Sequence, residues 1–313
     1  MMKKIILPAP AKVNLFLRIL GKRKDGYHEI SSLMQPVSLY DQVTVTVSEG
    51  AGVAVGSSNP SVPKDNENIA FKAATFFLNE SGLDKRVDIW LDKRIPMGAG
   101  LVGGSSDAAA VLKGLNTLSG EPFDPFDNVQ LKALGALIGS DVPFFIQCRP
   151  AIASGRGEKL SEVSLPSYHY ILVNPGFEVS TAWAYGNFDL TKSDKDNNLL
   201  YSHPPHPTPP PIPPWRKGGM GGVGWGGWDG GGGVDAIKGR LVNDLEAVTS
   251  ARYPAIGEIK KTLKDSGAVA AIMSGSGPTV FGIYGSCLER DRAFQLLEPR
   301  LNDPFTLFRV DGL

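Results

Sequence analysis

Apolar and polar residues alternate along several short stretches in the first hundred residues of the chain. Residues 11–20 carry apolar side chains at every second position: Val13, Leu15, Leu17 and Ile19. This period of two is typical of a strand with one buried face. The same alternation predicts strands at residues 42–48 and 87–93. A turn signal at residues 24–26, Lys-Asp-Gly, follows the first strand.

Helical spacing occurs between and after these strands. Residues 68–81 place apolar side chains three and four positions apart, and Gly82 is suited to ending a helix there. A second helix is predicted from about residue 105 to residue 118, closed by Gly120, and a third at residues 128–138. The N-terminal half therefore combines strands and helices.

The C-terminal half repeats this mixture. Strands are predicted at residues 168–173, 268–273, 279–284 and 306–310, and helices at 241–251, 256–266 and 288–297. Strands and helices intermingled in both halves indicate a mixed α and β class. The length of 313 residues fits one large or two medium domains, with a weakly marked boundary near residues 150–165.

One segment, residues 203–234, interrupts this pattern. It holds 11 of the 37 glycines, 8 of the 24 prolines and 3 of the 5 tryptophans. Prolines remove backbone donors and glycines raise the entropy lost on ordering, so the composition predicts a disordered insertion. A polyproline II ligand for an aromatic-lined partner groove is the alternative.

The overall charge excludes some partners. Lysine plus arginine and aspartate plus glutamate both total 32, so the formal net charge is zero. A neutral chain gives no reason to expect binding to nucleic acid or to an acidic membrane. Any affinity for phosphate must come from a local arrangement of groups.

The cysteines and the N-terminus predict a cytoplasmic protein. Cys148 and Cys287 lie in no CxxC motif, which favours two unpaired thiols in a reducing compartment. The apolar run near the N-terminus stops at Pro8, too early for a signal peptide. No stretch of about 18 apolar residues predicts a membrane span.

A glycine-rich stretch follows the strand at 87–93 and opens the helix at 105–118. Its residues are Pro96, Met97, Gly98, Ala99, Gly100, Leu101, Val102, Gly103, Gly104, Ser105 and Ser106. Glycines let backbone amides approach an anion, and a helix N-terminus adds unpaired amides, so the stretch predicts a phosphate cradle. Ser105 and Ser106 are expected to cap the helix and to offer hydroxyls to phosphate or Mg²⁺. No Gly-Lys-Ser/Thr is present, which excludes a Walker A loop.

Three motifs together resemble those of the GHMP kinases, which include galactokinase, homoserine kinase and mevalonate kinase. They are residues 9–15, residues 96–108 and residues 273–282. The resemblance implies a small-molecule kinase that uses ATP and Mg²⁺. It implies an α+β fold with a ribosomal S5 domain 2-like N-terminal domain at residues 1–155. A ferredoxin-like C-terminal domain would follow at 156–313, interrupted by the insertion, with the active site in the cleft between them.

Within the family, the sequence is most similar to the branch whose acceptor alcohol carries a cytidine diphosphate group. The similarity is carried by residues 12–15, 25–28, 139–145, 179–185 and 243–246. A homoserine- or mevalonate-type kinase is the first alternative. A nucleotide-binding protein with impaired catalysis is the second, because Val102 stands where the family usually has glycine. A β-branched residue is costly wherever the backbone needs a positive φ.

Asp141 and Lys12 are the catalytic candidates. Asp141 precedes Val-Pro, so from the sequence it can be a helix N-cap, whereas the resemblance implies a general base for the acceptor hydroxyl. Lys12 lies on a strand, where a lysine is usually a solvated side chain. The resemblance places it beside Asp141, where its charge would offset charge on the transferred phosphoryl group.

The resemblance also assigns residues to the acceptor. They are Asn14, Tyr27, His28, Thr181, Tyr185, Gly275, Ser276 and Gly277. Tyr185 is expected to stack on cytosine, with Trp183 and Phe177 as alternatives, and Thr181 to touch the diphosphate. Residues 274–277 are expected to form a second nest of backbone amides, or simply a tight turn. The partner is a small molecule, and the chain is expected to be a monomer or a weak homodimer.

Overall fold

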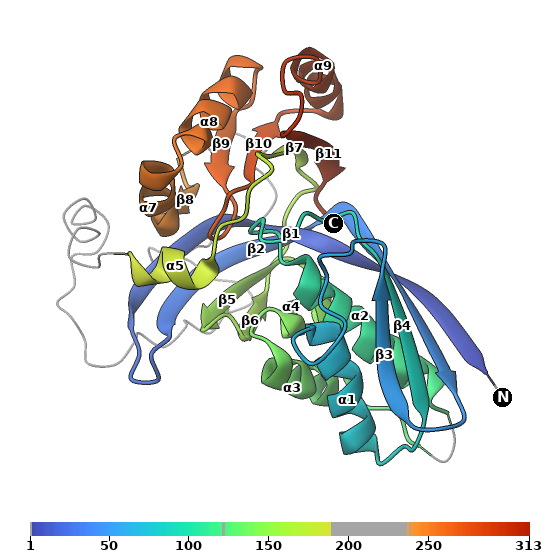
Figure 1. The fold of residues 1–313 in the computed structure, drawn as a ribbon. Helices are drawn as coiled ribbons and strands as arrows, with labels where there is room; N and C mark the ends of the chain where they lie inside the picture. The colour runs from blue at the N-terminus through green and yellow to red at the C-terminus, as the bar shows by residue number, and fades with distance from the viewer. Residues whose placement is uncertain (1, 121–122, 189–236, 238) are drawn as a thin grey trace.

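The computed structural model describes residues 2–120, 123–188, 237 and 239–313 (Figure 1). The predicted disordered insertion at 203–234 lies outside these residues. The described residues form two sheets, each with helices packed against it, and the site described below lies between them.

The larger sheet is built on one long antiparallel hairpin. Strand β1 (Lys3–Lys22) pairs with β2 (His28–Ser48) along almost its whole length. The strand order is β3-β4-β2-β1-β8, and β5 pairs with both β2 and β6. The shorter strands are β3 (Gly52–Ser57), β4 (Arg86–Asp92), β5 (Ala151–Gly155), β6 (Lys159–Glu162) and β8 (Val242–Asn243).

Helices cover one face of this sheet. They are α1 (Ile69–Ser81), α2 (Gly103–Leu118), α3 (Asn128–Ile138) and α4 (Val142–Gln147). Helix α2 is central, because it packs against α1, α4 and the β1–β2 hairpin. Its run of small residues from Ala108 to Ala110 is buried, which lets the helix approach the sheet closely.

The smaller sheet has the order β11-β7-β10-β9 and is antiparallel throughout. This order is that of a ferredoxin-like unit. Its strands are β7 (His169–Asn174), β9 (Ala270–Met273), β10 (Val280–Tyr284) and β11 (Thr306–Asp311). The helices of this half are α5 (Thr181–Gly186), α7 (Asp244–Arg252), α8 (Ala255–Asp265) and α9 (Cys287–Leu297).

The two sheets share a hydrophobic core. Val13 and Leu15 of β1 belong to the same buried cluster as Tyr170 and Phe281 of the smaller sheet. Residues 9–17 of β1 are therefore buried without alternation, since both faces of the strand are covered. The prediction of a strand with only one buried face was wrong for this central part of β1.

Most predicted elements are confirmed, with shifts at their ends. The first strand extends from Lys3 to Lys22, well beyond residues 11–20, and the strand predicted at 42–48 begins at His28. The prediction of an α+β class is confirmed. Both cysteines are free.

Candidate active site

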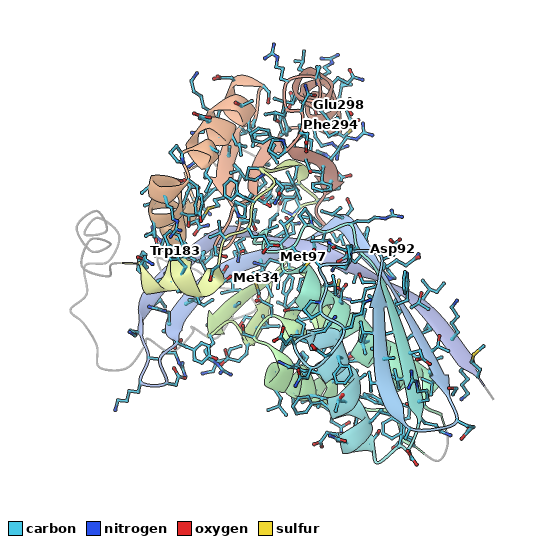
Figure 2. All side chains as sticks on the ribbon, in the orientation of Figure 1. Met34, Asp92, Met97, Trp183, Phe294 and Glu298 are labelled. Atoms are coloured by element: carbon cyan, nitrogen blue, oxygen red, sulfur yellow. The ribbon has the colours of Figure 1, made fainter. Side chains whose placement is uncertain are left out.

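A cavity of about 820 Å³ opens between the two halves of the molecule. Its wall is formed by the β1–β2 hairpin, the glycine-rich loop before α2, the start of α4, helix α5 and the loop between β9 and β10. Met34 and Met97, which both line it, lie in the middle of the molecule (Figure 2). Segments far apart in sequence therefore meet at one site.

The two glycine motifs pack directly against each other in this wall. Gly98 and Gly100 have φ angles of 57° and 73°, a region that favours glycine. A Cβ on Gly100 would collide with the carbonyl oxygen of Ser274, and the Ser274 hydroxyl donates a 3.0 Å hydrogen bond to the Gly100 carbonyl. The backbone of one loop thus fixes the path of the other.

Val102 has a left-handed backbone conformation, which elsewhere in the loop is adopted by the glycines Gly98 and Gly100. Its φ is 60° and its ψ is 36°, and it stands at the N-cap position of α2. A left-handed conformation destabilises an ordinary L-residue by roughly 1–2 kcal/mol. The loop therefore holds a strained valine at the point where the backbone turns into the helix. Its side chain lines the cavity and packs against the core of the N-terminal half.

The expectation that Ser105 and Ser106 cap the helix was wrong. Helix α2 begins at Gly103, so both serines already lie inside its first turns, and no side chain caps its N-terminus. Ser106 is buried and its hydroxyl has no hydrogen-bond partner within the described structure. Neither serine is among the residues that line the cavity.

Lys12 is held in a buried polar chain on the cavity side of β1. Its ammonium donates to the side-chain oxygen of Asn14, whose amide donates to the Ser32 hydroxyl at 2.7 Å. Ser32 in turn donates to the carbonyl of Phe16 at 2.7 Å. Burial lowers the pKa of Lys12, and the nearby charge of Asp141 partly offsets that effect. Asn14, predicted to touch substrate, thus also positions Lys12.

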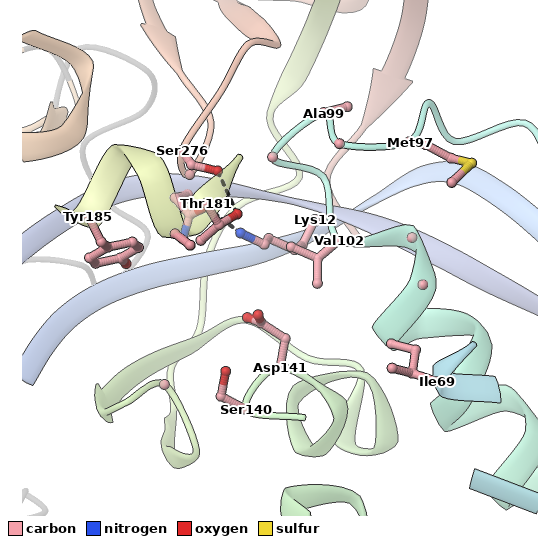
Figure 3. A pocket seen from close by; sticks show the side chains of 18 of the residues that line it. Lys12, Ile69, Met97, Ala99, Val102, Ser140, Asp141, Thr181, Tyr185 and Ser276 are labelled. Carbon is pink, nitrogen blue, oxygen red and sulfur yellow. Dashed lines mark hydrogen bonds between the residues drawn. The ribbon is translucent and has the colours of Figure 1, made fainter. Parts of the chain in front are cut away.

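Asp141 stands at the N-cap position of α4 without acting as a cap. Its side chain accepts no hydrogen bond from the helix backbone, so the carboxylate is free to face the cavity. Figure 3 shows Asp141 and Lys12 on opposite walls of the same space, Asp141 at the start of α4 and Lys12 on the hairpin strand. The carboxylate also contributes, after burial, to raising the pKa of Tyr185 above its ordinary range. The three groups therefore share one electrostatic environment.

A second buried charge cluster lies beside the glycine loop. The ammonium of Lys93 contacts Asp41 and lies 2.6 Å from a carboxylate oxygen of Asp107. The other oxygen of Asp41 accepts the amides of Arg94 and Ile95 at 2.6 and 2.8 Å. Burial raises the pKa of Asp107 to about 7, although Lys93 opposes the effect. The cluster ties β2 and the segment just after β4 to α2 at the start of the loop.

The other end of the cavity carries aromatic side chains. The rings of His28 and Tyr185 lie 5.3 Å apart, and Thr181 and Ser276 share a 3.0 Å hydrogen bond. Tyr27 is 57% exposed at the mouth of the cavity. This arrangement offers flat surfaces and polar groups to a ring-bearing ligand.

The two alternative stacking aromatics lie elsewhere. Phe177 stacks on Tyr253 at 4.8 Å, and Trp183 packs edge-on to the same ring at 6.1 Å. Neither is among the residues that line the cavity. Of the three aromatics considered from the sequence, the geometry favours Tyr185 for stacking.

The loop at 274–277 is held from outside the cavity by α7 and the strand before it. The Asn243 amide donates 2.8 Å hydrogen bonds to the carbonyls of Met273 and Gly275. Glu246 accepts the Met273 amide at 2.9 Å. The loop is therefore both a tight turn and a fixed part of the cavity wall.

Most of the predicted site residues line the cavity. They are Lys12, Asn14, Tyr27, His28, Pro96, Met97, Gly98, Ala99, Gly100, Val102, Gly103, Gly104, Asp141, Thr181, Tyr185, Gly275 and Ser276. The predicted residues that do not line it are Leu101, which is fully buried, Ser105, Ser106 and Gly277. The sequence prediction missed Lys22, Asn68, Lys93, Asp107 and Arg156, which also line it.

Within the described part of the chain, no group of three histidine, cysteine, aspartate or glutamate side chains is arranged to hold a metal ion. No described helix combines the length and the apolar character needed to cross a bilayer.

Comparison with known proteins identifies relatives along most of the chain. Residues 68–149 match the model of the GHMP kinases N terminal domain, and residues 235–299 match the GHMP kinases C terminal model. A 4-diphosphocytidyl-2-C-methyl-D-erythritol kinase from Syntrophotalea carbinolica is 45% identical over 277 residues, which cover 88% of each chain.

Solved structures agree with these matches. A crystal structure of 4-(cytidine 5'-diphospho)-2C-methyl-D-erythritol kinase is 31% identical, with a TM-score of 0.71 and coverage of 99% of this chain and 100% of that one. A homoserine kinase from Cytophaga hutchinsonii is 19% identical, with a TM-score of 0.67 and coverage of 99% and 94%. The second likeness concerns the fold alone.

Proposed function

The chain belongs to the GHMP kinases, within the family of the 4-diphosphocytidyl-2-C-methyl-D-erythritol kinases, and from this we propose its reaction. It transfers the γ-phosphate of ATP to the 2-hydroxyl of 4-diphosphocytidyl-2-C-methyl-D-erythritol. This is a step of the non-mevalonate pathway to isoprenoid precursors. The protein is thus a phosphotransferase that acts on a small-molecule alcohol.

One observation carries the proposal. Lys12 of β1 and Asp141 at the start of α4 line the same cavity as the glycine-rich loop. Lys12 is buried, burial lowers its pKa, and the nearby charge of Asp141 partly offsets that effect. A free carboxylate, a buried ammonium and a phosphate-binding loop are the groups that phosphoryl transfer to an alcohol requires.

Each of the two residues has a distinct role. Asp141 accepts the proton of the acceptor hydroxyl as the hydroxyl oxygen attacks the phosphorus atom. Lys12 keeps Asp141 ionised and offsets negative charge on the transferred group. Asn14 and Ser32 hold Lys12 in place, so the ammonium needs no reorganisation during the reaction.

The residues of the glycine-rich loop suit the phosphates of a nucleoside triphosphate. Gly98 and Gly100 turn the backbone so that amides are available beside the N-terminus of α2, which attracts anions. Mg²⁺ bound with ATP would neutralise phosphate charge. In such sites the ion is held largely by phosphates and water, with one or two protein carboxylates. Asp107 is the carboxylate of the cavity wall that would contribute, whereas Ser105 lies outside the wall.

We also place the protein in the cytoplasm. Two free thiols suit a reducing compartment, and both proposed substrates are water-soluble phosphorylated metabolites. The expected monomer or weak homodimer stays a prediction from the sequence.

Turnover of ATP across a panel of alcohols tests the proposed reaction. The purified protein is expected to consume ATP with the cytidyl acceptor, and at least a hundredfold less efficiently with mevalonate or homoserine. Preference for either of those alcohols would overturn the acceptor assignment. The absence of any alcohol-dependent ATP consumption would favour a nucleotide-binding protein with impaired catalysis.

Asp141→Asn tests the role of the carboxylate. Because an asparagine cannot accept the proton, kcat is expected to fall by about 10²–10⁴-fold, while ATP binding measured by calorimetry stays unchanged. Asp265→Asn, on the exposed end of α8, is the control and should retain full activity. A kcat within threefold of wild type in Asp141→Asn would exclude this residue as the base.

A further inference from the structure

Asp41 of β2 is a buried carboxylate that the mechanism described above does not use. Its exposed fraction is 0%, and it is not among the residues that line the cavity. Removing a charged group from water destabilises the fold unless its oxygens find partners inside the protein. The partners of Asp41 therefore show which segments this charge holds in place.

One oxygen of Asp41 holds the chain where it enters the glycine-rich loop. It accepts the backbone amides of Arg94 and Ile95 at 2.6 and 2.8 Å. Both residues follow the end of β4 and directly precede Pro96, where the loop begins. Hydrogen bonds to a charged acceptor are stronger than those between neutral groups. The entry to the loop is therefore fixed to β2.

The other oxygen of Asp41 lies where the chain leaves the loop. A Cβ on Gly103, the first residue of α2, would lie 3.1 Å from this oxygen and 3.0 Å from the Ile95 side chain. The same oxygen pairs with the Lys93 ammonium, which also lies 2.6 Å from Asp107 of α2. The entry and the exit of the loop thus meet at one carboxylate.

The middle of the loop is held by its carbonyl groups. The carbonyls of the consecutive residues Gly98 to Leu101 each accept a hydrogen bond of 3.0–3.3 Å from another segment. The donors, in that order, are the Val179 amide, the Thr279 amide, the Ser274 hydroxyl and the Lys12 amide. In a planar trans peptide the amide points opposite to the carbonyl, so these bonds leave the loop amides on the other side. None of these donors belongs to β2, so β2 holds the loop at its base, through Asp41.

We propose that Asp41 is a positioning residue for the glycine-rich loop. It keeps the two ends of the loop together and so fixes the positions from which the loop amides meet phosphate. Asp41 acts through the loop, since it lies outside the cavity wall. A loop whose ends can separate presents its amides over a range of positions and binds phosphate less tightly. The inference rests on the proposed function in one respect, that the phosphate bound there is the triphosphate of ATP.

Calorimetry with ATP tests this role without requiring turnover. Asp41→Ala removes both oxygens and is expected to weaken ATP binding by about tenfold or more, as for loss of a hydrogen bond to a charged group. Asp41→Asn keeps one oxygen for the backbone amides but turns an NH₂ group toward Lys93, so its loss should be smaller. Both variants leave Lys93 paired with Asp107, and both are expected to fold.

Hydrogen exchange of backbone amides supplies a second readout. Peptides that cover residues 96–104 should exchange about tenfold faster in Asp41→Ala, while peptides from α8 and β9 exchange as in wild type. A purely structural role would instead accelerate exchange of core amides throughout the molecule. In steady-state kinetics KM for ATP should rise by about tenfold in Asp41→Ala, with KM for the cytidyl acceptor within about threefold of wild type.

Asp244→Asn is the matched control. Asp244 is also a largely buried carboxylate, and it accepts the Ile19 amide at 2.8 Å and pairs with Arg18 at 3.1 Å. None of these three residues lines the cavity. The control should keep ATP affinity and loop exchange close to those of wild type. An equal loss of ATP affinity in Asp244→Asn would overturn the assignment, because the effect would then follow from losing any buried carboxylate.

The outcomes distinguish this inference from the proposed function. Wild-type ATP affinity and loop exchange in Asp41→Ala would overturn the positioning role alone. If Asp41→Ala does not fold, the same result in Asp41→Asn overturns it. A wild type that binds ATP without phosphorylating the cytidyl acceptor would overturn the proposed reaction, while weaker ATP binding in Asp41→Ala would still support the role of Asp41. A wild type that binds no ATP would overturn both.

Discussion

Val102 shows how one side chain can oppose the conformation of the loop that contains it. Glycine adopts a φ near +60° readily, whereas the side chain of a β-branched residue clashes with its own backbone at this φ, as Val102 must. The isopropyl group packs against the core of the N-terminal half while it lines the cavity, and these contacts offset part of the strain. The sequence alone identified the departure at this position, but only the φ of the folded chain shows that it is strained.

Substitution of Val102 by glycine and by alanine measures this strain. Because alanine retains a Cβ in the left-handed region, Val102→Gly should be more stable than Val102→Ala by about 1 kcal/mol in chemical denaturation. The dissociation constant of ATP should be equal or lower in Val102→Gly, since the removed group borders the loop.

Val129 provides the matched control. It is an exposed valine in helix α3, where the usual order applies and alanine should be the more stable of the two substitutions. The same order at both positions would show that the backbone at Val102 is not strained.

Residues of the site differ in how far the sequence could predict them. Lys12 and Asp141 were predicted because each lies in a recognisable motif. Lys93 and Asp107 were missed, since their pairing with each other and with Asp41 depends on the packing of α2 against the hairpin. Nothing in the sequence around Lys93 indicates that it pairs with Asp41, a buried residue 52 positions away.

At the scale of elements, the buried cluster of Asp41, Lys93 and Asp107 connects two strands with the first turns of α2. Two carboxylates and one ammonium carry a net negative charge in a region shielded from water. The pKa of Asp107 is raised to about 7 because burial penalises its charged form. The folded protein holds this proton more tightly than the unfolded chain does, whose pKa is near 4. The free energy of unfolding therefore falls as the pH rises from about 4 through the folded pKa of about 7.

Asp107→Asn tests this linkage. The neutral amide does not ionise, so between pH 5 and pH 8 the variant should gain about 2 kcal/mol of unfolding free energy relative to wild type. Denaturation at the two pH values measures the difference. Asp265→Asn, which alters an exposed pair with Lys261, should show no such dependence. An equal difference at both pH values for Asp107→Asn would contradict the raised pKa.

Element boundaries were harder to predict than the elements themselves. The first half of β2 was missed because buried polar residues interrupt its alternation. The Ser32 hydroxyl donates a hydrogen bond to the Phe16 carbonyl. The Gln35 side chain donates to the Pro166 carbonyl and accepts from the Tyr170 hydroxyl. Helix α2 was predicted to begin at its serines, yet Gly103 and Gly104 are already helical. In both cases tertiary contacts, which are absent from local propensity, decide the outcome.

At the scale of the whole molecule, two separate sheets provide one site. The class and the association of the three motifs at residues 9–15, 96–108 and 273–282 could be predicted from the sequence. The continuous burial of β1 and the charge clusters could not, because they arise only where the second sheet and α2 cover the hairpin. The domain boundary near residue 155 stays a prediction.

Residues 203–234 give the prediction that belongs to this scale. Replacing them by a short glycine–serine linker should leave kcat within threefold and the melting temperature within a few degrees, because the entropy of closing a loop changes only slowly with its length. The cavity-lining residues that the structure describes belong to other parts of the chain. A glycine–serine linker of the original length is the control for shortening the connection. Failure of both variants to fold would show that the segment is structural.

The return of the last residues to the first hairpin has a consequence for synthesis on the ribosome. Gly312 forms a bridge with Val37, and the Leu313 amide donates to the Pro36 carbonyl at 2.9 Å. Strand β8 likewise adds to β1 from beyond residue 240. In a nascent chain β2 can therefore pair early with β4 and β5, whereas β1 waits for β8 and Val37 waits for Gly312 until nearly the whole chain has been made. Until then the apolar face of β1 is a surface that a chaperone would need to shield.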